Sequence, residues 1–176
     1  MILETKRLIL RSWEENDAES LYFYAKDDRV GPICGWTPHQ SVENSLFVIT
    51  HFLKVEGIFA IVLKETYQVI GSIGVNVGEK SNLKLPKDEG EIGYWIGVPF
   101  WGQGLMPEAV KAVIQYAFET LKLKKLWCSY FDGNNQSKRV MEKCGFHYHH
   151  TNKDILWEKL NKIVTEHVYL LENTYL

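Results

Sequence analysis

The stretch from Glu91 to Ala109 limits the possible folds of this chain more than any other. It reads EIGYWIGVPFWGQGLMPEA: an apolar run typical of a strand, a turn containing Gly102 and Gly104, and the start of a helical pattern. Glycine lets the backbone come close to a ligand, and the free N–H groups at a helix N-terminus favour an anion. The stretch therefore predicts a strand–turn–helix unit with a phosphate-binding turn.

A plain structural turn is the alternative, because many strand-to-helix turns use glycine for its backbone freedom alone. The sequence contains neither the G-x-x-x-x-G-K-[ST] phosphate loop nor the G-x-G-x-x-G dinucleotide motif. Pro107 suits the first turn of a helix, and Glu108 suits the helix dipole rather than contact with a phosphate. The turn is therefore a candidate anion site that needs a second signal.

The remaining pattern predicts one domain of strands and helices. Strands are expected over Arg7–Trp13, Ile58–Leu63, Val69–Val77, Glu91–Val98, Lys125–Phe131, Phe146–Trp157 and Ile163–Leu171. Helices are expected from Asn16 or Asp17 to Lys26, from Ser41 to the residue before Gly57, and over Met106–Leu121 and Asn135–Lys143. This order predicts an α/β fold, a mixed sheet covered by helices, in a single domain spanning residues 1–176.

Composition and charge exclude several classes of protein. The net charge of -2 gives no general signal for nucleic acid or an anionic membrane. The apolar runs are shorter than the roughly 20 residues that cross a bilayer. The three cysteines, Cys34, Cys128 and Cys144, form no C-x-x-C pair, which favours a reducing compartment. We expect a cytoplasmic protein that binds neither nucleic acid nor a membrane.

A second motif follows the glycine turn downstream. It reads NNQSKRVMEKCGF over Asn134–Phe146, directly after one expected strand and at the start of an expected helix. Together the two segments resemble the GNAT superfamily of acetyl-CoA-dependent N-acetyltransferases. The turn resembles the pyrophosphate-binding Gln/Arg-x-x-Gly-x-Gly/Ala motif, and the second segment resembles the N-x-x-S-x-x-hydrophobic-hydrophobic-E-K-x-G-F motif. The run Gly93-Tyr94-Trp95 resembles the branch of ribosomal-protein N-terminal acetyltransferases, the Rim type.

The resemblance implies a mostly antiparallel central sheet that splays between its fourth and fifth strands, Glu91–Val98 and Lys125–Phe131, with helices on both sides. Acetyl-CoA would lie in this gap. The residues expected to bind it are Ile96, Gly97, Val98, Gly102, Gln103, Gly104, Leu105, Met106, Asn134 and Ser137. Two positions depart from the family motif: Trp101 stands where Gln or Arg is common, and Met106 where Gly or Ala is common.

The resemblance also implies the reaction, a direct attack of a primary amine on the thioester of acetyl-CoA. The amine would belong to a protein N-terminus, including that of a ribosomal protein, to a peptide or to a small molecule. Glu91 resembles the position of the catalytic base, and a water relay or a merely solvated acid is the alternative. Ser137 is the candidate acid for the departing thiolate, with Tyr130 and Tyr148 as alternatives and a helix-capping hydroxyl as the structural explanation.

Three further expectations follow. His147, His149 and His150 are expected to be exposed strand histidines rather than metal ligands, so no metal is expected. The alternative to an enzyme is a non-catalytic acyl-CoA-binding sensor on the same fold. The oligomeric state is left open between monomer and homodimer.

Overall fold

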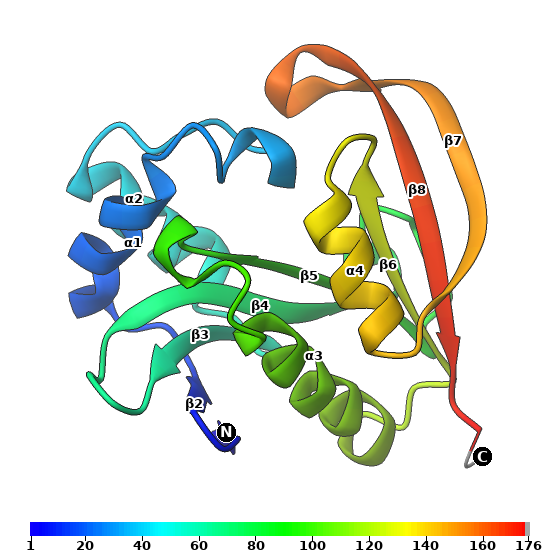
Figure 1. Ribbon diagram of the computed structural model, residues 1–176, viewed down its shortest axis with the longest axis horizontal. Coiled ribbons are helices and arrows are strands. Elements are labelled where there is room, and N and C mark those ends of the chain that lie inside the picture. Colours follow the sequence, from blue (N-terminus) through cyan, green and yellow to red (C-terminus); the bar gives the residue numbers. More distant parts are fainter. Residues whose placement is uncertain (175–176) are drawn as a thin grey trace.

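The structure, a computed structural model, describes residues 1–174 and shows one α/β domain built on an eight-stranded sheet (Figure 1). The strands are β1 (Leu3–Glu4), β2 (Leu8–Arg11), β3 (Ile58–Leu63), β4 (Val69–Val77), β5 (Glu89–Ile96), β6 (Lys125–Phe131), β7 (His147–Trp157) and β8 (Lys162–Glu172). Their order is β1-β2-β3-β4-β5-β6-β8-β7, and β5–β6 is the parallel pair in an otherwise antiparallel sheet. The predicted fold class is confirmed; the last two residues of the predicted domain lie outside the described residues.

Helices cover both faces of this sheet. They are α1 (Ala18–Ala25), α2 (Val42–Val48), α3 (Leu105–Gln115) and α4 (Asn135–Lys143). A π-helical turn extends α2 over Ile49–Leu53 and another extends α3 over Tyr116–Thr120. Short 3₁₀ turns lie at Glu15–Asp17, Pro32–Cys34, Gly78–Lys80, Val98–Phe100 and Glu158–Leu160. No helix within residues 1–174 is long and apolar enough to cross a membrane.

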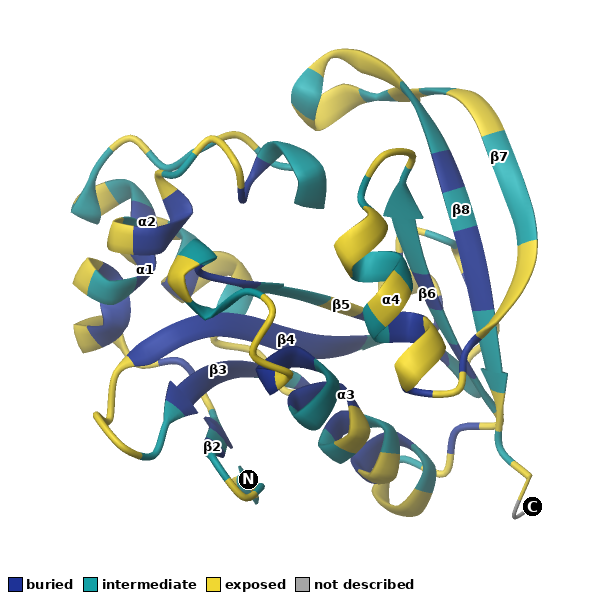
Figure 2. Cartoon of the chain, in the orientation of Figure 1, coloured by how far each residue is buried: buried dark blue, intermediate teal, exposed yellow. Residues whose placement is uncertain are grey.

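Two hydrophobic cores, one on each face, hold the helices to the sheet. On one face Leu105 and Val110 of α3 pack with Ile92 of β5. On the other face Leu21 of α1 packs in the core that contains Trp13. Figure 2 shows the result, with β4 buried along most of its length and many exposed residues on α4 and β7. The sheet is therefore a rigid central layer on which the connecting turns are placed.

The parallel pair β5–β6 comes apart along its length. The two strands pair only from Glu89 opposite Lys125 to Glu91 opposite Trp127, and they separate beyond that point. The predicted splay between the fourth and fifth strands is thus confirmed. Because neighbouring residues of a strand face opposite sides, Glu91 faces the side of α1 and α2, while Tyr94 faces the side of α3 and α4. The split joins the two faces.

Some element boundaries differ from the sequence prediction. The strand predicted over Glu91–Val98 begins at Glu89 and ends at Ile96, and Val98 lies in a 3₁₀ turn whose second residue is Pro99. Proline cannot donate to a strand ladder, which explains the early end of β5. β1 was not predicted, because two residues carry too little pattern to identify a strand.

Candidate active site

The glycine turn between β5 and α3 has the geometry of an anion site. Gly102 and Gly104 have φ angles of 74° and 73°, a left-handed conformation that other residues rarely adopt, and Gly104 is the N-cap of α3. A Cβ atom at Gly102 would meet nothing within 4 Å, and one at Gly104 would meet only the Arg7 guanidinium at 3.8 Å. The turn therefore needs glycine for its backbone angles, and its surface is open to a ligand.

Arg7 of the N-terminal segment holds this turn in place. Its Nη1 donates to the carbonyl of Gln103 at 3.0 Å, and its Nε donates to Glu108 Oε2 at 2.8 Å. Burial favours a higher pKa for Glu108, but hydrogen bonds from Thr5 and Arg7 outweigh it, so that the pKa of this carboxyl is lowered. Glu108 is thus an ionised anchor of the first turn of α3 and is turned away from the anion site, in agreement with its predicted role.

A cavity of about 530 Å³, which we call the α4 cavity, opens from this turn toward α4. It is lined by Val30, Ile33, Cys34, Tyr94, Trp95, Ile96, Phe100, Trp101, Gly102, Gly104, Leu105, Met106, Pro107, Asn134, Gln136, Ser137, Arg139, Val140 and Lys143. Arg139 and Lys143 lie one helical turn apart on α4 and form no ion pair with any residue in the described part of the chain. Cationic side chains opposite a helix N-terminus suit an elongated ligand that carries phosphate groups.

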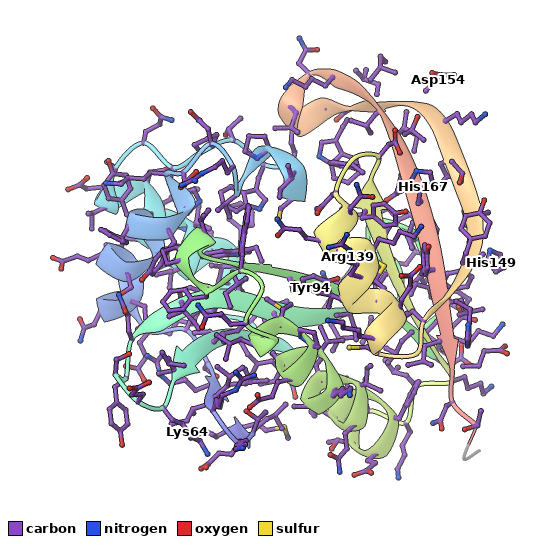
Figure 3. All side chains as sticks on the ribbon, in the orientation of Figure 1. Lys64, Tyr94, Arg139, His149, Asp154 and His167 are labelled. Carbon is purple, nitrogen blue, oxygen red and sulfur yellow. The ribbon has the colours of Figure 1, made fainter. Side chains whose placement is uncertain are left out.

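The start of α4 contributes a hydrogen-bonded group at the inner end of this cavity. Asn134 caps the helix, since its Oδ1 accepts from the Ser137 N–H at 3.2 Å. The Ser137 hydroxyl lies 2.9 Å from the hydroxyl of Tyr94, whose position beside α4 is visible in Figure 3. Burial, followed by the nearby Cys128, raises the pKa of Tyr94 well above 10. Tyr94 therefore keeps its proton and can donate it toward Ser137.

Tyr94 was not among the predicted site residues. The sequence does contain a signal for Tyr94. It is two residues from both Ile92 and Ile96, so it lies on the same face of β5 as these two residues. What the sequence does not show is that α4 lies over this face with Ser137 at its first turn.

A second, smaller cavity of about 120 Å³, which we call the Glu91 cavity, lies on the other side of the split. It is lined by Ile33, Cys34, Asn82, Glu91, Ile92, Gly93, Tyr94, Ser129, Tyr130, Phe131, Asn134, Ser137, Trp157 and Glu166. Both cavities share Cys34, Tyr94 and Ser137, so they meet where β5 and β6 separate. Trp157 donates to the Gly35 carbonyl at 2.8 Å and joins the β7–β8 hairpin to the loop after α1 beside this cavity.

Glu91 is the predicted base, and it lies in the second cavity with only 6% of its surface exposed. Its Oε2 accepts from the Asn82 N–H at 2.7 Å. Burial raises the pKa of Glu91, and the neighbouring carboxylate of Glu166 raises it further, while the N–H groups of Asn82 and Leu83 act in the opposite direction. Such a carboxyl is a stronger base than an ordinary glutamate.

The structure brings most of the predicted ligand-binding residues together, but not all of them. Ile96, Gly102, Gly104, Leu105, Met106, Asn134 and Ser137 line the α4 cavity, whereas Gly97, Val98 and Gln103 line neither cavity. Gly97 packs against Tyr24, where an added Cβ would lie 2.5 Å from the ring. The Val98 carbonyl accepts from the Trp101 N–H at 3.1 Å, inside the turn.

The two departures from the family motif have structural explanations. The Trp101 indole Nε1 donates to the Ile96 carbonyl at 2.8 Å, so it fastens the end of β5 to the turn. Met106 is buried in the core beneath α3 and also borders the α4 cavity. The Trp101 side chain thus holds the turn to the end of β5, and the Met106 side chain holds the start of α3 to the core.

The alternative candidates occupy different positions. Tyr130 lines the Glu91 cavity, and burial raises its pKa to about 12. Tyr148 is 58% exposed on β7 and lines neither cavity. His149 and His150 contact each other on the exposed β7 strand, and within residues 1–174 no group of three or more His, Cys, Asp or Glu side chains is arranged to hold a metal ion.

The split sheet, the glycine turn and the two adjoining cavities form a site for an elongated ligand with phosphate groups beside a buried carboxyl group. Comparison with known proteins is more specific. The Acetyltransferase (GNAT) domain family matches residues 7–147. An uncharacterized N-acetyltransferase of Bacillus licheniformis, p20, is 33% identical over 149 residues, which cover 82% of this chain and 81% of the relative. The chain therefore belongs to the GNAT acetyltransferase family.

Solved structures show the same fold. A GNAT-family acetyltransferase from Bacillus anthracis superposes with a TM-score of 0.85 at 22% identity, covering 98% of both chains. The ribosomal-protein-S5-alanine acetyltransferase of Vibrio fischeri gives 0.78 at 20% identity, covering 99% of this chain and 98% of that one. The microcin C7 self-immunity acetyltransferase MccE, solved with acetyl-CoA and AMP, gives 0.78 at 18% identity, covering 96% and 93%.

The predicted family is thus confirmed, and its structural neighbours include ribosomal-protein acetyltransferases of the predicted Rim type. The protein is an N-acetyltransferase, an acyltransferase that uses acetyl-CoA.

Proposed function

We propose that this protein transfers the acetyl group of acetyl-CoA to a primary amine by direct attack of the amine nitrogen on the thioester carbon. The observation that carries the proposal is the meeting of the two cavities at the split in the sheet. Glu91 lies on one side of this junction and the Ser137–Tyr94 pair on the other. A base and a proton donor thus flank the place where the reacting atoms would meet.

Acetyl-CoA is proposed to occupy the α4 cavity. The backbone N–H groups of residues 102–106 would hold the pyrophosphate, with Arg139 and Lys143 adding positive charge. The pantetheine arm would follow the end of β5 past Ile96, and the thioester would lie beside Ser137. Asn134 supports this arrangement indirectly, because it fixes the first turn of α4 and donates to the Ile33 carbonyl at 3.4 Å.

The proton balance uses the groups of both cavities. The acceptor arrives as an ammonium ion, and Glu91 takes one proton so that the nitrogen lone pair is free. The nitrogen then forms a bond to the thioester carbon, the carbon–sulfur bond breaks, and the electron pair leaves on sulfur. Ser137, hydrogen-bonded to Tyr94, gives its hydroxyl proton to the sulfur. The nitrogen then gives up its second proton, which restores the Ser137 hydroxyl. The products are an amide, free CoA and one proton.

As the acceptor we propose a protein or peptide N-terminus, in preference to a lysine side chain. An α-amine has a pKa of about 7.7–8.0, against about 10.4 for lysine, so it needs less help to lose its proton. The similarity in fold to the ribosomal-protein-S5-alanine acetyltransferase makes the N-terminus of a ribosomal protein the first acceptor to test. A cytoplasmic location and the absence of nucleic-acid and membrane partners remain predictions from the sequence.

Two measurements test the proposal. Calorimetry should show that acetyl-CoA binds the folded protein, and thiol release should show transfer to at least one member of a panel of N-terminal peptides, polyamines and aminoglycosides. Absence of binding by the folded protein would refute the proposal. Binding without transfer to any amine would favour the non-catalytic acyl-CoA sensor.

A further inference from the structure

We propose that the Glu91 cavity is a cation site for the acceptor, and that Glu166 binds the ammonium group while Glu91 removes its proton. The ligand is the primary ammonium group at one end of a larger acceptor molecule. This inference rests on the proposed function and adds a binding residue that the sequence analysis did not single out.

Glu166 reaches the cavity through the order of the strands. β8 lies between β6 and β7, and Glu166 stands opposite Phe131 of β6. Phe131 and Ser129 face away from α4, because Cys128 and Tyr130 face the core beneath that helix. Glu166 therefore shares the face of Glu91, and both line the same cavity.

The two carboxylates are buried without a cationic partner. Glu91 is 6% exposed and Glu166 is 4% exposed. None of the residues that line the Glu91 cavity is Lys, Arg or His, and neither carboxylate forms an ion pair with any residue of the described chain. Buried carboxylates are costly unless they are paired with a cation or bound to a metal. The cation missing from this pair is, in our inference, the ammonium group of the acceptor.

The other titratable groups near the pair are neutral. Burial raises the pKa of Cys34 and of Tyr130 to about 12, and it raises those of Cys128 and Tyr94 above their ordinary values. These groups come from the loop after α1 and from β5 and β6, and β8 contributes Glu166 itself. At neutral pH the charge in the cavity therefore belongs to the two carboxyl groups.

The hydrogen bonds and positions of the two carboxylates suit them to different roles. Glu166 accepts from Ser129 Oγ at 2.7 Å and from Asn152 Nδ2 at 3.2 Å, so both of its oxygens are held in place by hydrogen-bond donors. Glu91 accepts from the backbone N–H groups of Asn82 and Leu83, and it lies beside the split, next to the place proposed for the thioester. Glu166 is thus suited to hold a cation and Glu91 to accept a proton.

The size of the cavity limits what can enter. A volume of about 120 Å³ is well below the roughly 300–1,000 Å³ of pockets that enclose a whole small-molecule ligand. The ammonium group and its first carbon atoms would enter, and the rest of the acceptor would lie outside. A peptide N-terminus and a long aliphatic amine both meet this condition. Both contain an ammonium group on a short carbon chain, and propylammonium represents this shared part.

The binding test uses propylammonium chloride as the probe, with 1-propanol and potassium chloride as neutral and ionic controls. The protein carries ¹³C-labelled glutamate carboxyl groups, and Glu91→Gln and Glu166→Gln variants assign the two buried signals by NMR. Propylammonium should lower the apparent pKa of the pair, and the controls should not. Glu166→Gln should weaken propylammonium binding about tenfold, the loss of one buried charge interaction. Equal responses to all three additives would overturn the proposal.

The kinetic test uses whichever amine proves to be an acceptor. Glu166→Gln should raise KM about tenfold with a smaller change in kcat, and it should move the acidic limb of kcat/KM to lower pH, because the charge that raises the pKa of Glu91 is gone. Glu166→Asp should restore part of the KM. Glu172→Gln, an exposed acid on the same strand, is the matched control and should leave both quantities unchanged.

The outcomes separate the two proposals. The NMR titration needs no acetyl-CoA, so ammonium binding without acetyl transfer would refute the proposed function alone. Acetyl transfer that Glu166→Gln leaves unchanged in KM and in pH profile would refute this inference alone. A melting temperature for each variant shows whether the protein is folded. If Glu166→Gln does not fold, a Ser129→Ala variant gives a second way to disturb the position of Glu166, because it removes one of its two hydrogen bonds.

Discussion

The two cavities of this protein meet at one split in the sheet, but their lining side chains carry opposite charges. The α4 cavity is lined by residues of a glycine turn, by apolar side chains and by two cations, Arg139 and Lys143. The Glu91 cavity is lined by Glu91 and Glu166 and by no cationic side chain. This difference in charge supports the proposal that the phosphates of acetyl-CoA bind on one face of the sheet and the ammonium group of the acceptor on the other.

The proposed arrangement of the two substrates requires the split between β5 and β6. A continuous ladder between β5 and β6 would separate the two faces, and the substrates could not touch. Because the pairing ends at Glu91 and Trp127, Tyr94 and Ser137 border both cavities. The reacting atoms can then meet in the gap while each substrate keeps to its own face.

The largest effect is expected from Glu91→Gln. Loss of the base should lower kcat/KM for amine acetylation by about 10²- to 10⁴-fold. Acetyl-CoA affinity should not change, because Glu91 does not line the α4 cavity. The melting temperature at neutral pH should not fall, since the substitution removes a buried charge and keeps the acceptor oxygen for Asn82. A variant that loses stability and CoA binding together would instead assign Glu91 a structural role.

The same carboxyl predicts a pH profile. The raised pKa of Glu91 places the acidic limb of kcat/KM above the titration range of an ordinary glutamate. Activity should therefore be lost as the pH falls through this raised pKa, and it should be full above it. A plot of kcat/KM against pH for an identified acceptor measures the limb. A limb at the ordinary glutamate value would contradict the buried, charge-coupled environment.

The next largest effect is expected from substitutions in the glycine turn. Gly102→Ala and Gly104→Ala should each weaken acetyl-CoA binding about tenfold, which corresponds to about 1.4 kcal/mol, since a side chain would strain or obstruct the turn. Gly145→Ala is the matched control, because Gly145 has a φ of 89° and lines neither cavity. Calorimetry measures all three. Similar weakening in all three variants would attribute the effect to backbone strain alone.

Removal of the two cations of the α4 cavity should have a moderate effect. The double variant Arg139→Gln and Lys143→Gln should weaken acetyl-CoA binding about fivefold at low salt, and by less at high salt, because exposed charges are screened. Lys138→Gln is the control on the same helix, since Lys138 pairs with Glu142 and does not line the cavity. A salt-independent loss would speak against a phosphate contact.

The smallest effect is expected from Tyr94→Phe. The variant loses the contacts of the Tyr94 hydroxyl with the Ser137 hydroxyl and the Ser137 carbonyl, so kcat should fall about threefold. Ser137→Ala, which removes the proposed donor itself, should lower kcat further. Single-turnover kinetics with an identified acceptor measures both. A Tyr94→Phe variant more damaged than Ser137→Ala would make Tyr94 the direct donor.

The sequence predicted the local parts of this site better than their assembly. The strands Ile58–Leu63, Val69–Val77 and Lys125–Phe131 and the helix Asn135–Lys143 have the predicted bounds, because periodicity and capping residues are local signals. The C-terminal end of β5 differs, since the 3₁₀ turn over Val98–Phe100, which contains Pro99, competes with the strand. The π-helical turns after α2 and α3 also leave no mark in the hydrophobic period.

The second carboxylate could not be found in this way. Glu166 lies in an amphipathic strand where an acid normally faces water, and nothing in its neighbourhood along the chain distinguishes it. It becomes a site residue because β8 inserts between β6 and β7. Strand order is a long-range property of the fold, so the partner of Glu91 depends on the tertiary structure.

A crystal structure of the protein with CoA and propylammonium tests the two-sided site most directly. The pyrophosphate is predicted on the N–H groups of residues 102–106, the sulfur beside Ser137, and the ammonium nitrogen between Glu91 and Glu166. The sulfur and the nitrogen should lie on opposite faces of the split. CoA bound outside the α4 cavity, or an ammonium group on the same face as the pyrophosphate, would contradict the arrangement.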